Sequence, residues 1–309
     1  TQNLDRKEWR AIPAKSCFSL AAAELGWPIE KTIQLGLHSA PFTRLRPYLI
    51  VNQRILVTVR DGEAVEPLIK YLFDTGFRES EVFVLEALGS VSQQVTKTIV
   101  KDKTTGNFQH PLMLGIKVSG DGDSLPQASG IGDDWFSHDG QMTKQPIRAL
   151  TLSALAPKKG QYLWDLGSGS GSIAIEWLLS GPSMKATAVE KNSNRVANIN
   201  LNAKKLGVDW IDVIEADYID VLDKLDPPDA VFIGGGFGAE IFAKLWKIIP
   251  AGTLLVTNSV TIETDRLIVD YAEKFGGQLL RFEYSQPKQI GGKSSWKSSY
   301  PITQWVVVR

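Results

Sequence analysis

Three alternating glycines lie in the segment LWDLGSGSGSIAIEW, between a strand-like apolar run and a helix-like one. Gly167, Gly169 and Gly171 have the spacing G-x-G-x-G, and glycines at such a turn let the backbone approach a ligand closely. The dinucleotide fingerprint requires G-x-G-x-x-G, and the ATP-binding loop requires a lysine directly after its last glycine. Neither condition is met, because residue 172 is Ser and no Lys follows Gly171. The loop therefore favours another ligand, with NAD as the second choice.

Two carboxylates indicate what that ligand is. Asp165 precedes the glycines, where an acidic side chain repels phosphate but suits an ammonium or sulfonium cation. Glu190 ends the next strand-like run, where a carboxylate can accept both hydroxyls of a ribose. Further along, Ala216 and Asp217 in IDVIEADYI offer a backbone amide and a carboxylate to an adenine edge. These residues together predict a site for S-adenosylmethionine (SAM).

Composition excludes several classes of protein. The 309 residues contain 34 Lys plus Arg and 34 Asp plus Glu, so the basic excess expected of a nucleic-acid-binding protein is absent. Cys17 is the single cysteine, which rules out an intrachain disulfide and favours a reducing, cytoplasmic setting; it lies in an apolar segment and is expected in the core. No apolar run is long enough to span a membrane, and no His/Cys cluster has the spacing of metal ligands.

The elements that position these residues follow a clear linker. Residues 117–134 are crowded with Gly, Ser and Asp, so we expect a linker at 120–132 between domains at 1–119 and 133–309. After it, strand-like and helical segments alternate, which predicts an α/β fold with a mostly parallel sheet covered by helices on both faces. The expected strands are 161–166, 185–190, 229–236 and 252–260, the expected helices 172–179, 192–207, 237–248 and 262–275, and the segments 277–286 and 300–309 are expected to pair antiparallel. The first domain shows a similar but less complete α/β pattern.

Specific segments resemble enzymes of corrin biosynthesis. GDDWFSHDGQMTKQPIRAL, WDLGSGSGS, PDAVFIGGG and PITQWVVVR are similar to the CbiT family of decarboxylating methyltransferases, from about residue 130 to the end. IPAKSCFSLAAAELGWP, LGLHSAPF and VLEALGS are similar to the second half of the CbiE family of tetrapyrrole methylases. The two fused in this order resemble the CobL type. The resemblance implies a Rossmann-like class I SAM-dependent methyltransferase preceded by a partial class III methylase subdomain.

The resemblance also implies an activity. A CobL-type enzyme methylates meso carbons 5 and 15 of a precorrin-6 type ring and removes a carboxyl from the ring C acetate, giving precorrin-8. The glycine-rich first half of the CbiE family has no counterpart in this sequence, so the resemblance implies carbon-15 methylation and decarboxylation, with carbon 5 dependent on a complete N-terminal domain. It implies a precorrin as substrate, no nucleic-acid or membrane partner, and a homo-oligomer, with a tetramer as one expected form.

Matching the family motif adds residues to the site. The predicted cofactor contacts are then Thr143, Asp165, Gly167, Ser168, Gly169, Ser170, Gly171, Glu190, Ala216, Asp217 and Gly234. Lys144 and Arg148 are four residues apart on one helix face and could bind substrate carboxylates. The segment PKQIGGKSSWKSS could form a mobile basic lid from Lys288, Lys293 and Lys297 together with Trp296, of which Lys293 and Trp296 are predicted to contact the substrate. The alternatives are a helix cap for Thr143, a tight turn for Gly234, a solvated helix face for the basic pair and a solvated hairpin loop for the lid. No catalytic side chain is predicted.

Two other functions fit parts of the pattern. The same fold could methylate RNA or a small nucleophile, although the net charge of zero and the GGGF sequence after the fourth strand argue against base methylation. The N-terminal region could also be a non-catalytic docking or oligomerisation module, because strands without their partner half would expose apolar surface.

Overall fold

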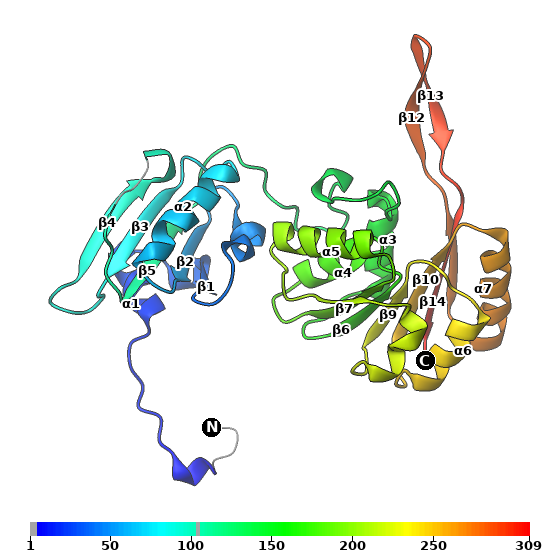
Figure 1. Cartoon of the computed structure of the whole chain (residues 1–309), viewed down its shortest axis with the longest axis horizontal. Helices are drawn as coiled ribbons and strands as arrows, with labels where there is room; N and C mark the ends of the chain where they lie inside the picture. Colours follow the sequence, from blue (N-terminus) through cyan, green and yellow to red (C-terminus); the bar gives the residue numbers. More distant parts are fainter. Residues whose placement is uncertain (1–4, 103–105) are drawn as a thin grey trace. The chain divides into compact units, whose positions relative to one another are not determined.

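The computed structural model of the chain describes residues 5–102 and 106–309 (Figure 1). These divide into two compact units, Thr1–Leu125 and Pro126–Arg309. The division falls inside the Gly- and Ser-rich segment 120–132. No helix among the described residues is long and apolar enough to cross a membrane.

The first unit is a five-stranded sheet between two helices. Its strand order is β1 (Thr32–Gly36), β2 (Arg54–Thr58), β5 (Leu112–Lys117), β3 (Glu81–Glu86) and β4 (Gln94–Ile99). Only β1 and β2 are parallel. Helix α2 (Val65–Asp74) packs in the cluster that contains Ile55 and Val57, whereas α1 (Cys17–Leu25) packs with Leu56. Since side chains alternate along a strand, the two helices cover opposite faces.

The first unit departs from the sequence-based expectation at Cys17. The residue begins α1 but is exposed, so its predicted place in the core is wrong. The apolar composition of α1 was misleading because only Ala21 and Ala22 of this helix are fully buried.

The second unit is built on a seven-stranded sheet. Its order is β11 (Gln278–Phe282), β14 (Ile302–Val308), β10 (Leu254–Ser259), β9 (Ala230–Ile233), β6 (Tyr162–Leu166), β7 (Lys185–Glu190) and β8 (Asp212–Glu215). The five strands from β10 to β8 are parallel. Strand β14 runs antiparallel between β10 and β11. The predicted α/β class and the antiparallel pairing of the last two sheet strands are both confirmed.

Helices cover both faces of this sheet (Figure 1). Helices α3 (Gln145–Leu155), α4 (Ser172–Leu179) and α5 (Ser193–Leu206) pack together on one side, and α6 (Ala239–Ile248) and α7 (Ile262–Phe275) lie on the other. Phe237, Phe242, Tyr271 and Trp305 form an aromatic cluster under α6 and α7. Burial of these large rings stabilises the packing of α6 and α7 against this face of the sheet.

A two-stranded hairpin extends from the second unit. Strands β12 (Ser285–Ile290) and β13 (Lys293–Ser298) pair antiparallel, and every residue in them is exposed. Figure 1 shows the hairpin projecting beyond the end of the large sheet.

Candidate active site

The site lies at the carboxyl ends of the parallel strands. From β6 the chain adds β7 and β8 on one side of the sheet. It then returns to place β9 on the other side of β6, so the strand order reverses between β6 and β9. Open α/β sheets bind ligands at such a switch point. Two adjoining hollows are found there, of about 510 and 180 Å³, and Gly167, Arg195 and Gly235 line both. Together they make one groove with a larger and a smaller arm.

The glycine loop forms the floor of this groove between β6 and α4. Gly169 has φ +59°, and a Cβ placed there would meet nothing nearer than the Gln141 carbonyl at 4.0 Å, so the space above it is open. A Cβ on Gly171, whose φ is +73°, would lie 2.8 Å from Ile199. The two glycines therefore differ: Gly169 leaves the space above the loop open, and Gly171 lets α4 approach α5.

Asp165 lies beneath the loop rather than in the groove wall. Its side chain is buried, its Oδ2 accepts a hydrogen bond from the Ala174 amide at 3.1 Å, and its Oδ1 has no partner among the described residues. Burial raises the pKa of Asp165 to about 7, and the charge of Glu190 adds to the rise, while the Ala174 amide opposes it. A cation above the loop would favour the ionised form.

Glu190 lines the smaller arm. One carboxylate oxygen accepts from the Gly169 amide at 2.9 Å and the other from the Asn192 amide at 3.0 Å. Ala216 and Asp217 line the same arm. The structure thus brings together three of the predicted ligand residues from the ends of β7 and β8, with the carboxylate held rigidly between two backbone donors.

The larger arm combines polar and apolar walls. Of the predicted residues it contains Thr143, Lys144, Gly167, Ser168, Gly169, Ser170 and Gly234. Ile147, Phe232 and Ile302 supply apolar lining, and Tyr284 and Tyr300 lie at its edge with the base of the hairpin. The arm is therefore suited to a large, partly apolar ligand. Gly171 is absent from the lining of both arms, as is Asp165.

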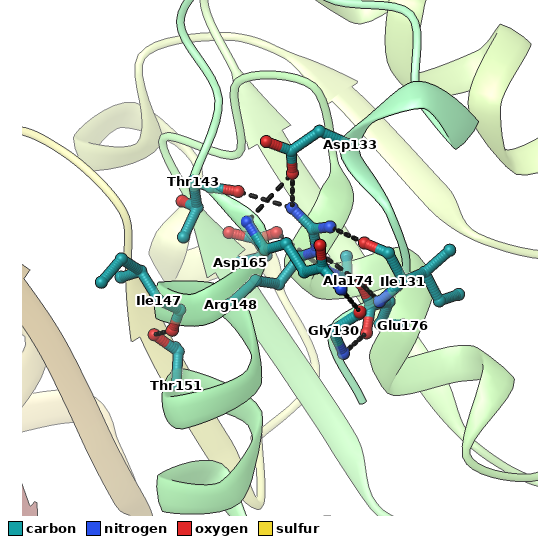
Figure 2. A network of polar contacts seen from close by, with 11 residues as sticks. Gly130, Ile131, Asp133, Thr143, Ile147, Arg148, Thr151, Asp165, Ala174 and Glu176 are labelled. Atoms are coloured by element: carbon teal, nitrogen blue, oxygen red, sulfur yellow. Dashed lines mark hydrogen bonds and ion pairs between the residues drawn. The ribbon is translucent and has the colours of Figure 1, made fainter. Parts of the chain in front are cut away.

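The interpretation of Arg148 as a substrate cation is wrong. Its side chain is fully buried and lies in an ion pair with Glu176 (Figure 2). Its remaining donors are directed at the Thr143 carbonyl, at 2.5 Å, at Asp133, at 3.2 Å, and at the Ile131 carbonyl. The spacing of four does not place both residues on one face, because α3 begins after Lys144. Lys144 stays exposed at the rim, whereas Arg148 is buried and lines neither arm.

The buried pair instead ties the segment before α3 to the helices. Glu176 on α4 also accepts from the amides of Gly130, at 2.6 Å, and Ile131, at 3.1 Å. Figure 2 shows the amides of Gly130 and Ile131 directed at Glu176, which in turn contacts Arg148. Since the segment continues into Thr143 at the groove, the pair fixes one wall of the larger arm.

Lys293 and Trp296 do not reach the groove in this structure. Both lie in β13, Trp296 is 74% exposed, and neither lines either arm. The base of the hairpin contributes instead: the Ser299 amide donates to the Tyr284 carbonyl at 2.7 Å, and both residues line the larger arm. Of the segment PKQIGGKSSWKSS, only Ser299 lines the larger arm.

Sequence reasoning missed three residues at or near the site. Arg195 lies between the two arms and is paired with Asp139 at 2.8 Å. Asn258, at the end of β10, lines the larger arm. Glu176 was detectable as a lone carboxylate in the apolar helix SIAIEWLL, whereas nothing local distinguishes Arg195 or Asn258. Among the described residues, no group of three or more potential metal ligands is present.

The sheet order, the glycine loop after β6 and the carboxylate at the end of β7 define a methyltransferase of the Rossmann-like class. A model of the family described as "Precorrin methyltransferase domain" matches residues 134–309. The chain belongs to the precorrin-6Y C5,15-methyltransferase (decarboxylating) family. It is 41% identical over 303 residues to the "Precorrin-6Y C(5,15)-methyltransferase [decarboxylating]" of Sinorhizobium sp, covering 96% of this chain and 73% of the relative.

Two further relatives cover a smaller part of the chain. The "Probable cobalt-precorrin-6B C(15)-methyltransferase (decarboxylating)" of Pyrobaculum aerophilum is 36% identical over 192 residues, which are 58% of this chain and 96% of the relative. The crystal structure of the C-terminal domain of precorrin-6Y C5,15-methyltransferase from Rhodobacter capsulatus has a TM-score of 0.58 and 39% identity, covering 60% of this chain and all of that domain. The family and fold implied by the sequence resemblance are confirmed.

Proposed function

We propose that the second unit methylates carbon 15 of a precorrin-6 type tetrapyrrole with SAM and removes carbon dioxide from the ring C acetate. The observation that carries this proposal is the two-armed groove, which has a ribose-type carboxylate in one arm and a large, partly apolar space in the other. Both arms meet at Gly167, where a methyl donor and its acceptor would come together. The match of the family model to residues 134–309 supports assigning both steps to this unit.

The residues of the smaller arm and the loop fit SAM. Asp165 Oδ1 is buried without a partner, so a nearby cation would stabilise its charge. The open space above Gly169 would let the ligand lie close to the backbone. In the proposal Glu190 accepts the ribose hydroxyls, Ala216 and Asp217 lie at the adenine, and Thr143 and Gly234 border the methionine part. When bound, SAM would supply an electrophilic methyl group.

The larger arm would hold the tetrapyrrole. Methyl transfer to an electron-rich ring carbon depends mainly on alignment at near-attack distance, so the walls must position the ring rather than deprotonate it. Ile147, Phe232 and Ile302 offer apolar contact, and Lys144, at the rim, offers a cation for one of the ring's carboxylates. The chain's contribution to decarboxylation would be an apolar surrounding for one carboxylate while the others stay paired.

Carbon-5 methylation remains a prediction for a complete N-terminal domain. The relative named for carbon 15 alone aligns over 192 residues, about the size of the second unit. The relative named for both carbons extends over nearly the whole chain and beyond it. In this proposal the first unit belongs to the carbon-5 domain, and the second unit carries the carbon-15 site.

A homo-oligomer and a cytoplasmic setting complete the proposal. The first rests on the family resemblance, with a tetramer as the expected form, and the second on the single cysteine in a biosynthetic methyltransferase family.

The test is the product mass after incubation of the full chain with SAM and a precorrin-6 type tetrapyrrole. We expect a gain of one methyl and a loss of one carbon dioxide. A gain of two methyls would contradict our restriction to carbon 15, and an unchanged mass would contradict the proposal as a whole.

Two variants extend the same experiment to the cofactor arm. Glu190→Ala should weaken SAM binding by about a hundredfold, because two charge-assisted hydrogen bonds are lost. Glu215→Ala is the matched control. Glu215 lies opposite Glu190 in the register of β7 and β8, but its side chain is exposed and does not line the groove. Equal SAM dissociation constants for both variants in calorimetry would refute the assignment of Glu190.

A further inference from the structure

One side-chain amide in the larger arm is held on both sides by buried polar groups. Asn258 lies near the end of β10, and its Nδ2 donates to the Thr151 hydroxyl of α3 at 2.8 Å. Its Oδ1 accepts from Gln304 Nε2 at 2.9 Å. Gln304 is its direct cross-strand partner on β14, and both Thr151 and Gln304 are almost completely buried. These are the amide's only hydrogen bonds within residues 5–102 and 106–309.

The hydrogen bonds fix which way the amide faces. A hydroxyl has one proton to donate, and Thr151 donates its proton to the Ile147 carbonyl at 2.8 Å. Thr151 can therefore only accept from Asn258, so the nitrogen of the amide must face α3. Its oxygen must then face Gln304, which donates to it. The usual ambiguity between amide oxygen and nitrogen is resolved by the network itself.

The orientation leaves one N–H of Asn258 for a ligand. The nearby lining of the larger arm includes Ile147, Phe232 and Ile302, which offer no hydrogen bonds from their side chains. A polar group in such a wall has a free-energy cost unless it finds a partner. A donor held rigidly in this way is suited to recognise one acceptor at one place.

We infer that Asn258 is a specificity-determining residue that donates a hydrogen bond to a carboxylate of the methyl-acceptor. The inference rests on the proposed function and names a contact within it. A hydrogen bond stabilises the charged carboxylate, whereas the carboxylate that leaves as carbon dioxide must give up its charge to the ring. The partner of Asn258 is therefore a carboxylate that stays on the product, and the contact orients the ring toward Gly167.

The first test replaces the amide with a side chain of similar size. Asn258→Leu should raise the KM for the tetrapyrrole roughly tenfold to a hundredfold, the effect of one hydrogen bond to a charged group. The SAM dissociation constant should stay unchanged, which also shows that the variant is folded. Methylation and decarboxylation should fall together. An unchanged KM, or an increase in the share of decarboxylated product, would overturn the inference.

The second test reverses the polarity of the partner. In Gln304→Glu, an ionised carboxylate can only accept, so it repels the Asn258 oxygen. The amide should rotate so that its nitrogen faces β14, and the Thr151 hydroxyl should then redirect its proton from the Ile147 carbonyl to the Asn258 oxygen. The protonated acid can donate as Gln304 does, so the KM of this variant should approach the wild-type value at low pH and rise as pH increases. Gln304→Met is the control, because Thr151 alone still fixes the amide and the KM should show no such pH dependence. The same pH profile in both variants would contradict the mechanism.

The two proposals fail in different ways. No turnover by the wild-type chain would refute the proposed function. Normal wild-type turnover with normal kinetics in Asn258→Leu would refute only the role of Asn258.

Discussion

At the scale of single residues, the buried carboxylate that lines the groove, Glu190, and the one beneath its glycine loop, Asp165, have different surroundings. Glu190 accepts an amide hydrogen bond on each oxygen, whereas Asp165 has one such bond and one oxygen without a partner in the described part of the chain. Burial therefore raises the pKa of Asp165 to about 7. The two hydrogen bonds hold Glu190 in place as an acceptor for a ligand. Ionised Asp165 carries a desolvation cost, which a cationic ligand would reduce.

The raised pKa of Asp165 predicts opposite effects on stability and binding. Its pKa is higher in the folded than in the unfolded chain, so the free energy of unfolding should fall as pH rises from about 4 to about 7. Asp165→Asn should remove this penalty, so the ligand-free variant should melt at a higher temperature than the wild type at pH 8. The difference should shrink toward pH 4.

Binding of SAM to the same pair of proteins supplies the second measurement. Wild-type affinity should rise with pH through about 7, since the ionised Asp165 favours the cation. Affinity of Asp165→Asn should be lower and should lack that rise. A melting temperature of the variant below that of the wild type at pH 8 would contradict the proposed penalty.

At the scale of elements, the wall of the larger arm depends on how α3 and α4 hold the segment between the linker and Thr143. The Arg148–Glu176 pair is buried between these helices and binds the backbone of residues 130 and 131. Its loss would leave one charge buried without its main partner. Loss of the pair should therefore destabilise both the packing of α3 on α4 and the wall of the larger arm.

Arg148→Met should lower the free energy of unfolding by about 3 kcal/mol, the usual cost of breaking a buried pair. Under conditions where the variant is still folded, it should also bind SAM more weakly, because the Thr143 carbonyl loses the hydrogen bond from Arg148. Denaturant unfolding and calorimetry measure the two effects. Lys144→Met is the control: Lys144 is 3.6 Å from Asp133 but exposed, and such pairs contribute about 1 kcal/mol or less. Equal losses of stability in the two variants would argue against the clamp.

At the scale of the whole molecule, the chain has separate cores. The clusters around β2 and β5 contain only residues of the first unit, and the cluster around β9 and β14 contains only residues of the second. Each unit is also of a size that can bury a core of its own. We therefore expect each unit to fold independently.

A fragment of residues 126–309 should therefore fold and bind SAM with the affinity of the full chain within about twofold. Circular dichroism and calorimetry on the fragment and the full chain check this expectation, with Glu190→Ala in the fragment as the control for specific binding. A fragment that is unfolded, or that binds SAM far more weakly, would mean that the first unit completes the site.

The sequence by itself determined the class of the fold and four of the residues that line the smaller arm, namely Gly167, Glu190, Ala216 and Asp217. Alternating apolar runs predict parallel strands and the helices between them. The two-residue or 3.6-residue spacing of apolar side chains can be recognised within one segment, whichever segments pack against it. Carboxyl ends of parallel strands meet at one edge, so residues such as Gly167, Glu190 and Ala216, each at a strand end, were expected together before the structure placed them there. Family resemblance added Thr143, which no local pattern marks as a ligand residue.

Only the tertiary structure decided which way side chains on the remaining elements face. Arg148 and Lys144 are four residues apart, yet α3 begins after Lys144, and packing of α3 on α4 buries the first and leaves the second at the rim. Asn258 has no signal in the sequence, because its hydrogen-bonding partners come from α3 and from β14, far away in the chain. Local periodicity encodes the type of an element, whereas the identity of its neighbours, and so the chemistry of a face, arises only from packing.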